Sequence, residues 1–274
     1  MKEKRIYILL LILVCLFITA CNTKHIKAEK SYHQKTEDKY AFYQVQNKKR
    51  YKDFQKEHPE LTLKDVIIRV NLNLDQPFYT HTSMSKDLNQ KEILVNKYFY
   101  LGEDYVPENL VELDKTYSKG GIFLVQEASD AFKRLVDAAK KEKVTIRAIS
   151  AYRSYSYQVS LYNRYVEQEG SKQADTYSAR PGFSEHQTGL CVDVDDRVTS
   201  FTDFETTKGF QWMQENAHHY GFILRYPKDK ENITGYQYES WHYRYVGKEI
   251  AKSIKESGQT FDEYYIEFLM KKSR

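Results

Sequence analysis

The stretch FSEHQTGLCVDVDD, residues 183–196, decides how this chain folds and what chemistry it can carry. It holds an imidazole at His186 and, seven residues later, a carboxylate at Asp193. Val192 and Val194 flank that carboxylate, and this alternation of apolar and polar side chains predicts a strand. The stretch therefore combines two potential metal ligands with a sheet-forming pattern.

A second stretch far downstream, YESWHYRY at residues 238–245, supplies further groups. It contains His242 and, three residues earlier, Glu239. Two neutral histidines and one carboxylate, namely His186, His242 and Asp193, make a three-ligand zinc site that leaves the fourth tetrahedral position for water. That arrangement is typical of catalytic rather than structural zinc, and Glu239 is then free to move protons.

Length and composition bound the remaining possibilities. The chain has 274 residues, 41% of them apolar, with 11 Gly and 5 Pro, so it can bury one sizeable core. Residues 2–5 contribute a net charge of +2 to the formal +4, and no arginine-rich stripe suits a phosphate backbone. We therefore expect one main domain and no nucleic-acid partner.

The N-terminus has the pattern of an export signal. Basic residues at 2–5 precede a 15-residue, mostly apolar run over 6–20, which is shorter than the roughly 20 residues of a spanning helix. Small residues directly before Cys21 resemble a bacterial lipobox, which implies cleavage there and attachment of diacylglycerol to the sulfur. A plain secretory signal is the alternative. The lipobox predicts a protein anchored by lipid to the outer face of the bacterial cytoplasmic membrane.

This interpretation also assigns roles to the remaining cysteines and to the next forty residues. Cys15 leaves with the signal and Cys191 keeps no partner, so no internal disulfide can form. Polar residues after Cys21 indicate a tether, and aromatic residues after Tyr40 suggest a docking helix. The predicted organisation is a signal peptide over 1–20, a tether with a docking helix over 21–60, and a domain that carries the zinc site over 61–274.

Hydrophobic periodicity predicts an α+β fold in which an antiparallel sheet carries the metal site and helices pack on one face. Alternation along a strand would put Glu239 and His242 on opposite faces, so we expect a bend or bulge between them. Gly189 similarly lets the backbone turn after His186. Strands are expected over 65–71, 93–96, 144–149, 189–194, 222–225 and 241–246, helices over 125–143, 156–168 and 204–220, and a loop over 80–90.

Three separated motifs carry a family resemblance. They are SAYRSY at 150–155, PGFSEHQTGL at 181–190 and YESWHYRYVG at 238–247. In this order they resemble the M15 zinc peptidases, and specifically the VanY-type D-alanyl-D-alanine carboxypeptidases and related L,D-carboxypeptidases. The similarity covers roughly residues 65–256, and it implies an M15 peptidase-like fold.

The resemblance implies Zn²⁺ held by His186, Asp193 and His242, with Glu239 as the general base. Asp195 and Asp196 could also ligate a metal, but only Asp193 has the family spacing. The family usually has Ala where this chain has Cys191. Because Cys191 shares strand parity with Asp193, its thiol could face the metal. We nevertheless expect it to pack.

Recognition of the substrate depends mainly on Arg153, because a guanidinium can grip a terminal carboxylate at two points. By resemblance, Gln158 and Ser184 line the same pocket, and Tyr226 adds a hydroxyl group. Trp241, beside the second histidine, is expected to form a wall of the site.

The predicted activity is removal of the C-terminal D-Ala from peptidoglycan stem peptides. The motifs leave other reactions open: L,D-cleavage of tetrapeptide to tripeptide stems, release of D-Ala-D-Ala, or endopeptidase cleavage within the stem. A non-catalytic wall-binding lipoprotein is a further alternative, although binding alone would not require Glu239. Nothing suggests a dimer seam, so we expect a monomer.

Overall fold

The computed structural model describes residues 39–86 and 90–270. The predicted signal peptide, 1–20, and the predicted lipidation site Cys21 lie outside these residues. Within the described ranges, no helix is long and apolar enough to cross a membrane. The chain divides into two compact units, one containing residues up to 67 together with residue 270, and the other residues 68–269.

The first unit contains the helix predicted after Tyr40. This helix, α2 (Lys48–Glu57), follows the short 3-10 helix η1 (Val45–Asn47) and buries Tyr51 and Phe54. The next helix, α3 (Leu63–Asn71), spans the boundary between the units. The predicted boundary at residue 60 stays a prediction.

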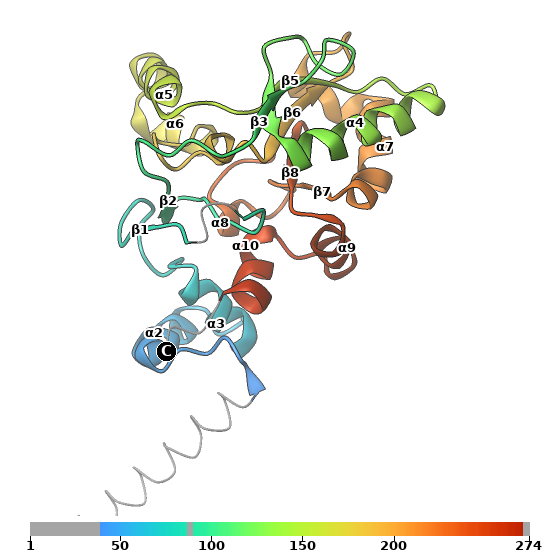
Figure 1. Ribbon diagram of the computed structural model, residues 1–274. Coiled ribbons are helices and arrows are strands. Elements are labelled where there is room, and N and C mark those ends of the chain that lie inside the picture. The colour runs from blue at the N-terminus through green and yellow to red at the C-terminus, as the bar shows by residue number, and fades with distance from the viewer. Residues whose placement is uncertain (1–38, 87–89, 271–274) are drawn as a thin grey trace, which may run out of the picture. The chain divides into compact units, whose positions relative to one another are not determined.

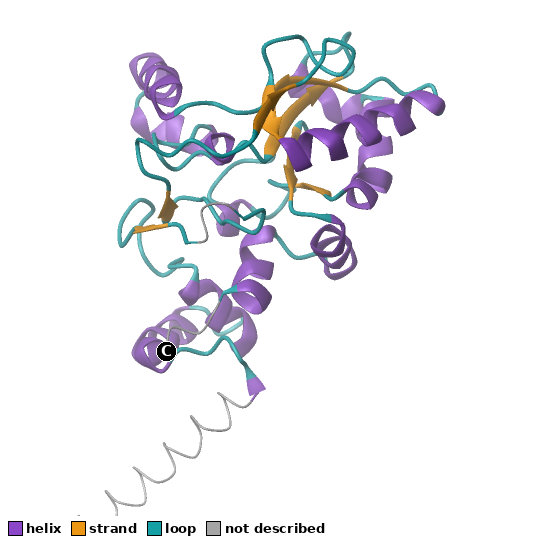
Figure 2. Ribbon diagram, viewed as in Figure 1, coloured by secondary structure: helices purple, strands orange, loops and turns teal. Residues whose placement is uncertain are grey.

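The second unit holds the sheet that carries the predicted motifs (Figure 2). Its strands run in the order β5-β6-β8-β7, and every neighbouring pair is antiparallel, as predicted. These strands are β5 (Arg147–Ser150), β6 (Cys191–Asp195), β7 (Phe222–Leu224) and β8 (His242–Tyr245).

The remaining elements surround this sheet. Two small sheets pair β1 (Ser83–Met84) with β2 (Phe99–Tyr100) and β3 (Leu110–Glu112) with β4 (Phe123–Val125). The helices are α4 (Gln126–Lys141), α5 (Tyr155–Glu169), α6 (Ser171–Tyr177), η2 (Glu185–Thr188), η3 (Phe201–Thr206), α7 (Lys208–Asn216), η4 (Ala217–Tyr220), α8 (Glu231–Thr234), α9 (Lys248–Ser257), α10 (Phe261–Tyr264) and η5 (Tyr265–Leu269).

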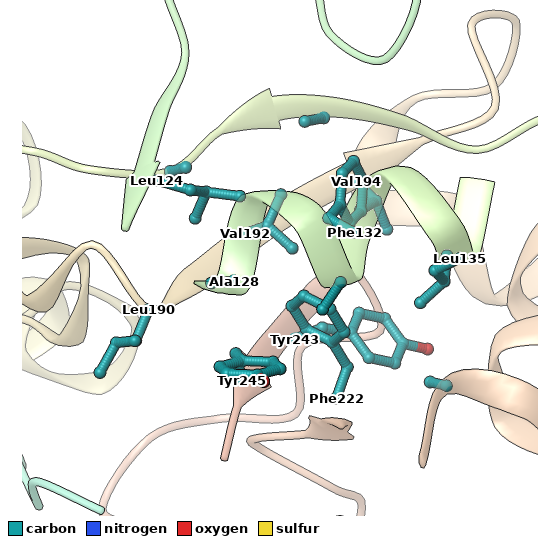
Figure 3. Close-up of a cluster of buried hydrophobic side chains, with 14 of the residues drawn as sticks. Leu124, Ala128, Phe132, Leu135, Leu190, Val192, Val194, Phe222, Tyr243 and Tyr245 are labelled. Atoms are coloured by element: carbon teal, nitrogen blue, oxygen red, sulfur yellow. The ribbon is translucent and has the colours of Figure 1, made fainter. Parts of the chain in front are cut away.

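Helix α4 covers one face of the sheet and creates the core (Figures 1 and 3). Its apolar residues recur at helical spacing, and Phe132 and Leu135 are completely buried. They pack in one cluster with Val192 of β6 and with Tyr243 and Tyr245 of β8. Side chains alternate along these strands, so the next residues, including Asp193 and His242, point away from this core. The opposite face of the sheet is thereby free to carry polar chemistry.

Two predicted strands are wrong. Residues 65–71 belong to helix α3, because Val66, Ile67 and Val70 are all buried at a spacing that fits a helix. Thr62 also accepts a hydrogen bond from the backbone N–H of Asp65, which stabilises the start of the helix. The β-branched residues suggested a strand, but the helical spacing of the buried residues and the cap at Thr62 favour a helix.

Residues 93–96 form an irregular buried segment rather than a strand. Ile93 and Val95 are fully buried, which accounts for their apolar character. The carbonyl of Ile93 accepts a hydrogen bond of 2.7 Å from Arg244 Nη2 instead of pairing in a sheet. A buried loop of this kind needs such a side-chain donor for its backbone groups.

Two further segments differ in detail from expectation. The region predicted as one helix over 204–220 is divided at Thr207, whose side chain accepts from the N–H of Phe210 and starts α7. Gly221 then ends η4 in the left-handed conformation, as expected for its position. The predicted loop over 80–90 contains strand β1.

Gly189 ends η2 with φ of +65°, and a Cβ there would lie 2.9 Å from Leu110 Cδ2. We predict that Gly189→Ala destabilises the protein more than Gly258→Ala, which has nearly the same backbone angle but no atom within 4 Å of its Cβ. The left-handed conformation alone costs about 1–2 kcal/mol, and only Gly189→Ala adds a steric clash. Urea unfolding measures both free energies, and equal losses would contradict the prediction.

Candidate active site

His186 stands in the short helix η2, just before strand β6, and is buried. Its Nδ1 lies 2.6 Å from the carbonyl oxygen of Ala151. A carbonyl can only accept, so Nδ1 carries a proton, and Nε2 is the nitrogen that has a free lone pair when the ring is neutral. That Nε2 lies 3.4 Å from Asp193 Oδ2. The imidazole is thus oriented with its coordinating nitrogen toward the carboxylate.

His242 begins strand β8 and stands directly opposite Asp193 in the antiparallel register. Its Nδ1 lies 3.0 Å from Asp193 Oδ1, and its ring centroid is 5.0 Å from that of His186. Asp193 therefore lies between two imidazole nitrogens. Asp195 instead pairs with Arg147, and Asp196 accepts hydrogen bonds from nearby backbone N–H groups, so neither competes for this place.

Arg153 approaches the same carboxylate from the segment after β5. Its Nη2 donates to Asp193 Oδ2 over 2.8 Å, and its Nε donates to Ser150 Oγ over 3.0 Å. Burial alone would raise the pKa of Asp193, but the charges of His186 and Arg153 hold it well below the usual range. Asp193 is consequently ionised and available as a ligand.

Glu239 lies in a turn before β8 rather than in the strand. The turn is closed by a hydrogen bond from the N–H of His242 to the carbonyl of Glu239, so the predicted bend is present. Glu239 Oε2 lies 3.6 Å from His242 Nδ1. Burial and the charge of Asp193 raise the pKa of Glu239 to about 7. A carboxyl group with this pKa can both accept and return a proton near neutral pH.

The residues predicted to bind substrate line the same cavity. Gln158 donates through Nε2 to the carbonyl of Ala179 over 2.7 Å, and its Oε1 is buried without a hydrogen-bond partner among the described residues. The ring of Tyr226 lies 4.9 Å from that of His242. The cavity has a volume of about 770 Å³, and its walls include Arg153, Gln158, Ser184, His186, Asp193, Tyr226, Glu239, Trp241 and His242.

Cys191 lies beside the two histidines, on the side of the strand that its parity with Asp193 predicted. It is fully buried, and its sulfur and one nitrogen each of His186 and His242 lie within 4.8 Å of one another. Burial would raise the pKa of the Cys191 thiol, but the two histidines lower it to about 7. The thiol therefore packs against the imidazoles and is a fourth potential donor. Asp193 stays the predicted third ligand, because its oxygens face a nitrogen of each imidazole.

Glu185 was not singled out by sequence patterns, although it belongs to the described site. Its Oε1 accepts hydrogen bonds from Arg225 and Arg244, and its Oε2 lies 3.6 Å from His242 Nε2. Arg225 directly follows the apolar strand β7, and Arg244 lies within the buried strand β8. A charge in such a position requires a buried counterion, and this is the signal that could have identified Glu185.

The donors fit zinc, which prefers a small set of imidazole, carboxylate and thiolate ligands at a buried site. A sheet with a helix on one face and such donors on the other defines the class of α+β proteins with a candidate zinc site. Comparison with known proteins identifies the family within this class.

A family model for the VanY D-alanyl-D-alanine carboxypeptidases matches residues 121–248. The chain is 45% identical to the putative carboxypeptidase YodJ of Bacillus subtilis over 179 residues. This alignment covers 63% of the chain and 66% of YodJ, so the chain spans just under two thirds of that relative's length.

Two solved structures are also similar. The LdcB LD-carboxypeptidase is 39% identical, with a TM-score of 0.64, over 69% of this chain and 91% of LdcB. A mutant of the D,D-pentapeptidase VanY from a VanB-type vancomycin resistance cassette, solved with Zn(II), is 34% identical. Its TM-score is 0.56, over 64% of this chain and 98% of that structure. The chain belongs to the VanY family of M15 zinc metallocarboxypeptidases, and zinc is its metal.

We predict that Asp193→Ala lowers zinc affinity more than Cys191→Ala does. Loss of a ligand should exceed the roughly 10–100-fold cost of losing an outer hydrogen-bonding partner. Competition with a chromogenic chelator measures the affinities of both variants. The cobalt-loaded protein should also lack a strong thiolate-to-cobalt charge-transfer band. Such a band, lost in Cys191→Ala, would instead make Cys191 a ligand.

Proposed function

We propose that this protein removes the C-terminal D-Ala from peptidoglycan stem peptides that end in D-Ala-D-Ala. The observation that carries the proposal is the placement of Glu239 and Arg153 around the same pair, Asp193 and His242, in one cavity. A group that moves protons and a group that grips a carboxylate are the two requirements of a carboxypeptidase. The similarity to the VanY pentapeptidase supports the D,D preference.

The metal would be held by His186, Asp193 and His242. When bound, zinc supplies a Lewis acid that polarises a carbonyl and makes water more nucleophilic near neutral pH. Glu239 contributes the proton transfers: Oε2 takes a proton from the attacking water and returns it to the leaving amine of D-Ala. The distance of 3.6 Å between Glu239 Oε2 and His242 Nδ1 supports this role.

Arg153 would bind the terminal carboxylate of the substrate. Its guanidinium is partly exposed in the cavity and offers a planar pair of N–H donors suited to a carboxylate. Gln158 Oε1 can accept from a peptide N–H, because that atom has no partner among the described residues. Burial raises the pKa of Tyr226 well above its usual value, so its hydroxyl stays protonated and can donate to a substrate oxygen. Ser184 lies on the same wall.

An L,D-carboxypeptidase is the second candidate function. The resemblance to the LdcB LD-carboxypeptidase favours it, since that structure covers a larger share of this chain than the VanY structure does. The two reactions differ in the residue before the scissile bond. The same catalytic groups would serve both, so product analysis must distinguish them.

We further propose that Cys21 carries a lipid that anchors the protein to the outer face of the cytoplasmic membrane. This proposal is supported by the sequence pattern before Cys21 alone. It would place the cavity on the same side of the membrane as its peptidoglycan substrate.

We expect the zinc-loaded protein to shorten a synthetic muramyl pentapeptide by one D-Ala and to leave the tetrapeptide intact. Mass spectrometry of the products separates this result from release of D-Ala-D-Ala or of a longer fragment. Conversion of the tetrapeptide to the tripeptide would establish the L,D activity instead. No cleavage of either peptide by protein with zinc shown to be bound would contradict the proposal.

Glu239→Ala should abolish measurable turnover while zinc remains bound. General acid–base catalysis contributes about 10²–10⁴-fold in rate, and Glu239 is not needed as a metal ligand. Steady-state kinetics and zinc content are measured together. His186→Ala is the control, because it should lose the metal as well as activity. Substantial turnover by Glu239→Ala would exclude it as the general base.

A further inference from the structure

The ring nitrogen of His242 that points away from Asp193, Nε2, faces the buried carboxylate of Glu185. His242 Nε2 lies 3.6 Å from Glu185 Oε2. Neither atom is exposed, and neither has a hydrogen-bond partner within the described residues. A buried polar atom without a partner is destabilising, so two such atoms facing each other call for an explanation.

The two ring nitrogens of His242 have different neighbours. Nδ1 faces Asp193 and Glu239 in the cavity, at 3.0 and 3.6 Å, whereas Nε2 faces Glu185. A proton on Nε2 leaves the lone pair of Nδ1 free to bind a metal. Without a metal, the closer Asp193 carboxylate keeps a proton on Nδ1. Once a metal engages Nδ1 and Asp193, the proton must lie on Nε2, and an ionised carboxylate there favours this state because it can only accept a hydrogen bond.

Glu185 is held in place by two buried arginines. Its Oε1 accepts from Arg225 Nε over 2.7 Å and from Arg244 Nη1 over 2.9 Å. All three side chains are nearly inaccessible to solvent. Two guanidinium groups on one carboxylate oxygen favour the ionised form of the side chain. The carboxylate therefore presents a fixed, ionised Oε2 to His242.

The same network reaches the C-terminal part of the second unit. Arg225 Nη1 pairs with Asp262 of α10 at 2.5 Å, and Asn96 Nδ2 donates to the other oxygen of Asp262 over 2.8 Å. Asp262 thus balances the charge of Arg225 from the side away from Glu185. The network therefore offers one carboxylate that faces His242 and a second that pairs with Arg225 and Asn96 instead.

We propose that Glu185 is a positioning residue that fixes the tautomer and ring orientation of His242 through its Nε2–H, and so increases the affinity for zinc. On binding of the metal at Nδ1, the Nε2–H donates to Glu185 Oε2 and both unpaired atoms gain a partner. This inference rests on the proposed function only in taking His242 as a ligand. It assigns Glu185 no contact with the substrate.

The first test uses the unmodified protein. In zinc-loaded protein labelled with ¹⁵N-histidine, NMR should show His242 protonated at Nε2 and metal-bound at Nδ1. The Nε2–H proton should be shifted downfield by its hydrogen bond to a carboxylate. Metal coordination through Nε2, or an Nε2–H signal typical of a solvent-exposed imidazole, would overturn the proposal.

The second test compares Glu185→Gln with Asp262→Asn. Both variants remove one negative charge from the same buried network and retain the side-chain shape. In Glu185→Gln the amide oxygen can stay on the arginines, so the NH₂ group faces His242 Nε2 and favours the tautomer that cannot bind zinc through Nδ1. Zinc affinity should fall by about 10–100-fold in Glu185→Gln, and by less than about threefold in Asp262→Asn.

Chelator competition measures these affinities, and urea unfolding shows how far each variant is destabilised. Equal losses of zinc affinity in the two variants, or no loss in Glu185→Gln, would refute the positioning role. If Glu185→Gln does not fold, the NMR result on the unmodified protein decides alone. Neither readout requires peptide cleavage, so a failure of the proposed D,D activity would be seen separately.

Discussion

The active site depends on one buried carboxylate, Asp193, which lies in the second strand of a four-stranded sheet. Removing an ionised carboxylate from water is costly, and here two imidazoles and the guanidinium of Arg153 compensate that cost. These groups hold the negative charge in place. The same arrangement keeps a nitrogen of each imidazole directed at one point, so little reorganisation is needed when a cation binds.

The register between β6 and β8 brings these groups together. Asp193 pairs with His242, and the neighbouring pair, Val192 with Tyr243, points into the core against α4. A slip of one residue would exchange the two faces and bury the ligands beneath the helix. The hydrophobic packing of α4 therefore determines the register, and the register determines the geometry of the site.

The strands of the sheet and the helices α4 and α5 could be predicted because their patterns are local. The placement of the site residues in one cavity followed instead from the family resemblance of three separated motifs. Alternation identified β6, and helical spacing identified α4. The segments at 65–71 and 93–96 were misjudged because β-branched residues occur there for burial rather than for strand pairing. Glu185 could not be found by such patterns, since its partners lie 40 and 59 positions away in sequence.

A hydrophobic core could supply about as much stability as the buried ionic network, which consists of Glu185, Arg225, Arg244 and Asp262. Buried ion pairs often cost as much in desolvation as they return in attraction, and apolar replacements of similar volume can be equally stable. An apolar side chain could not, however, favour one tautomer of His242. The two arginines hold one oxygen of Glu185, and this leaves the other directed at Nε2. The proposed orientation of His242 therefore explains the network better than a contribution to stability does.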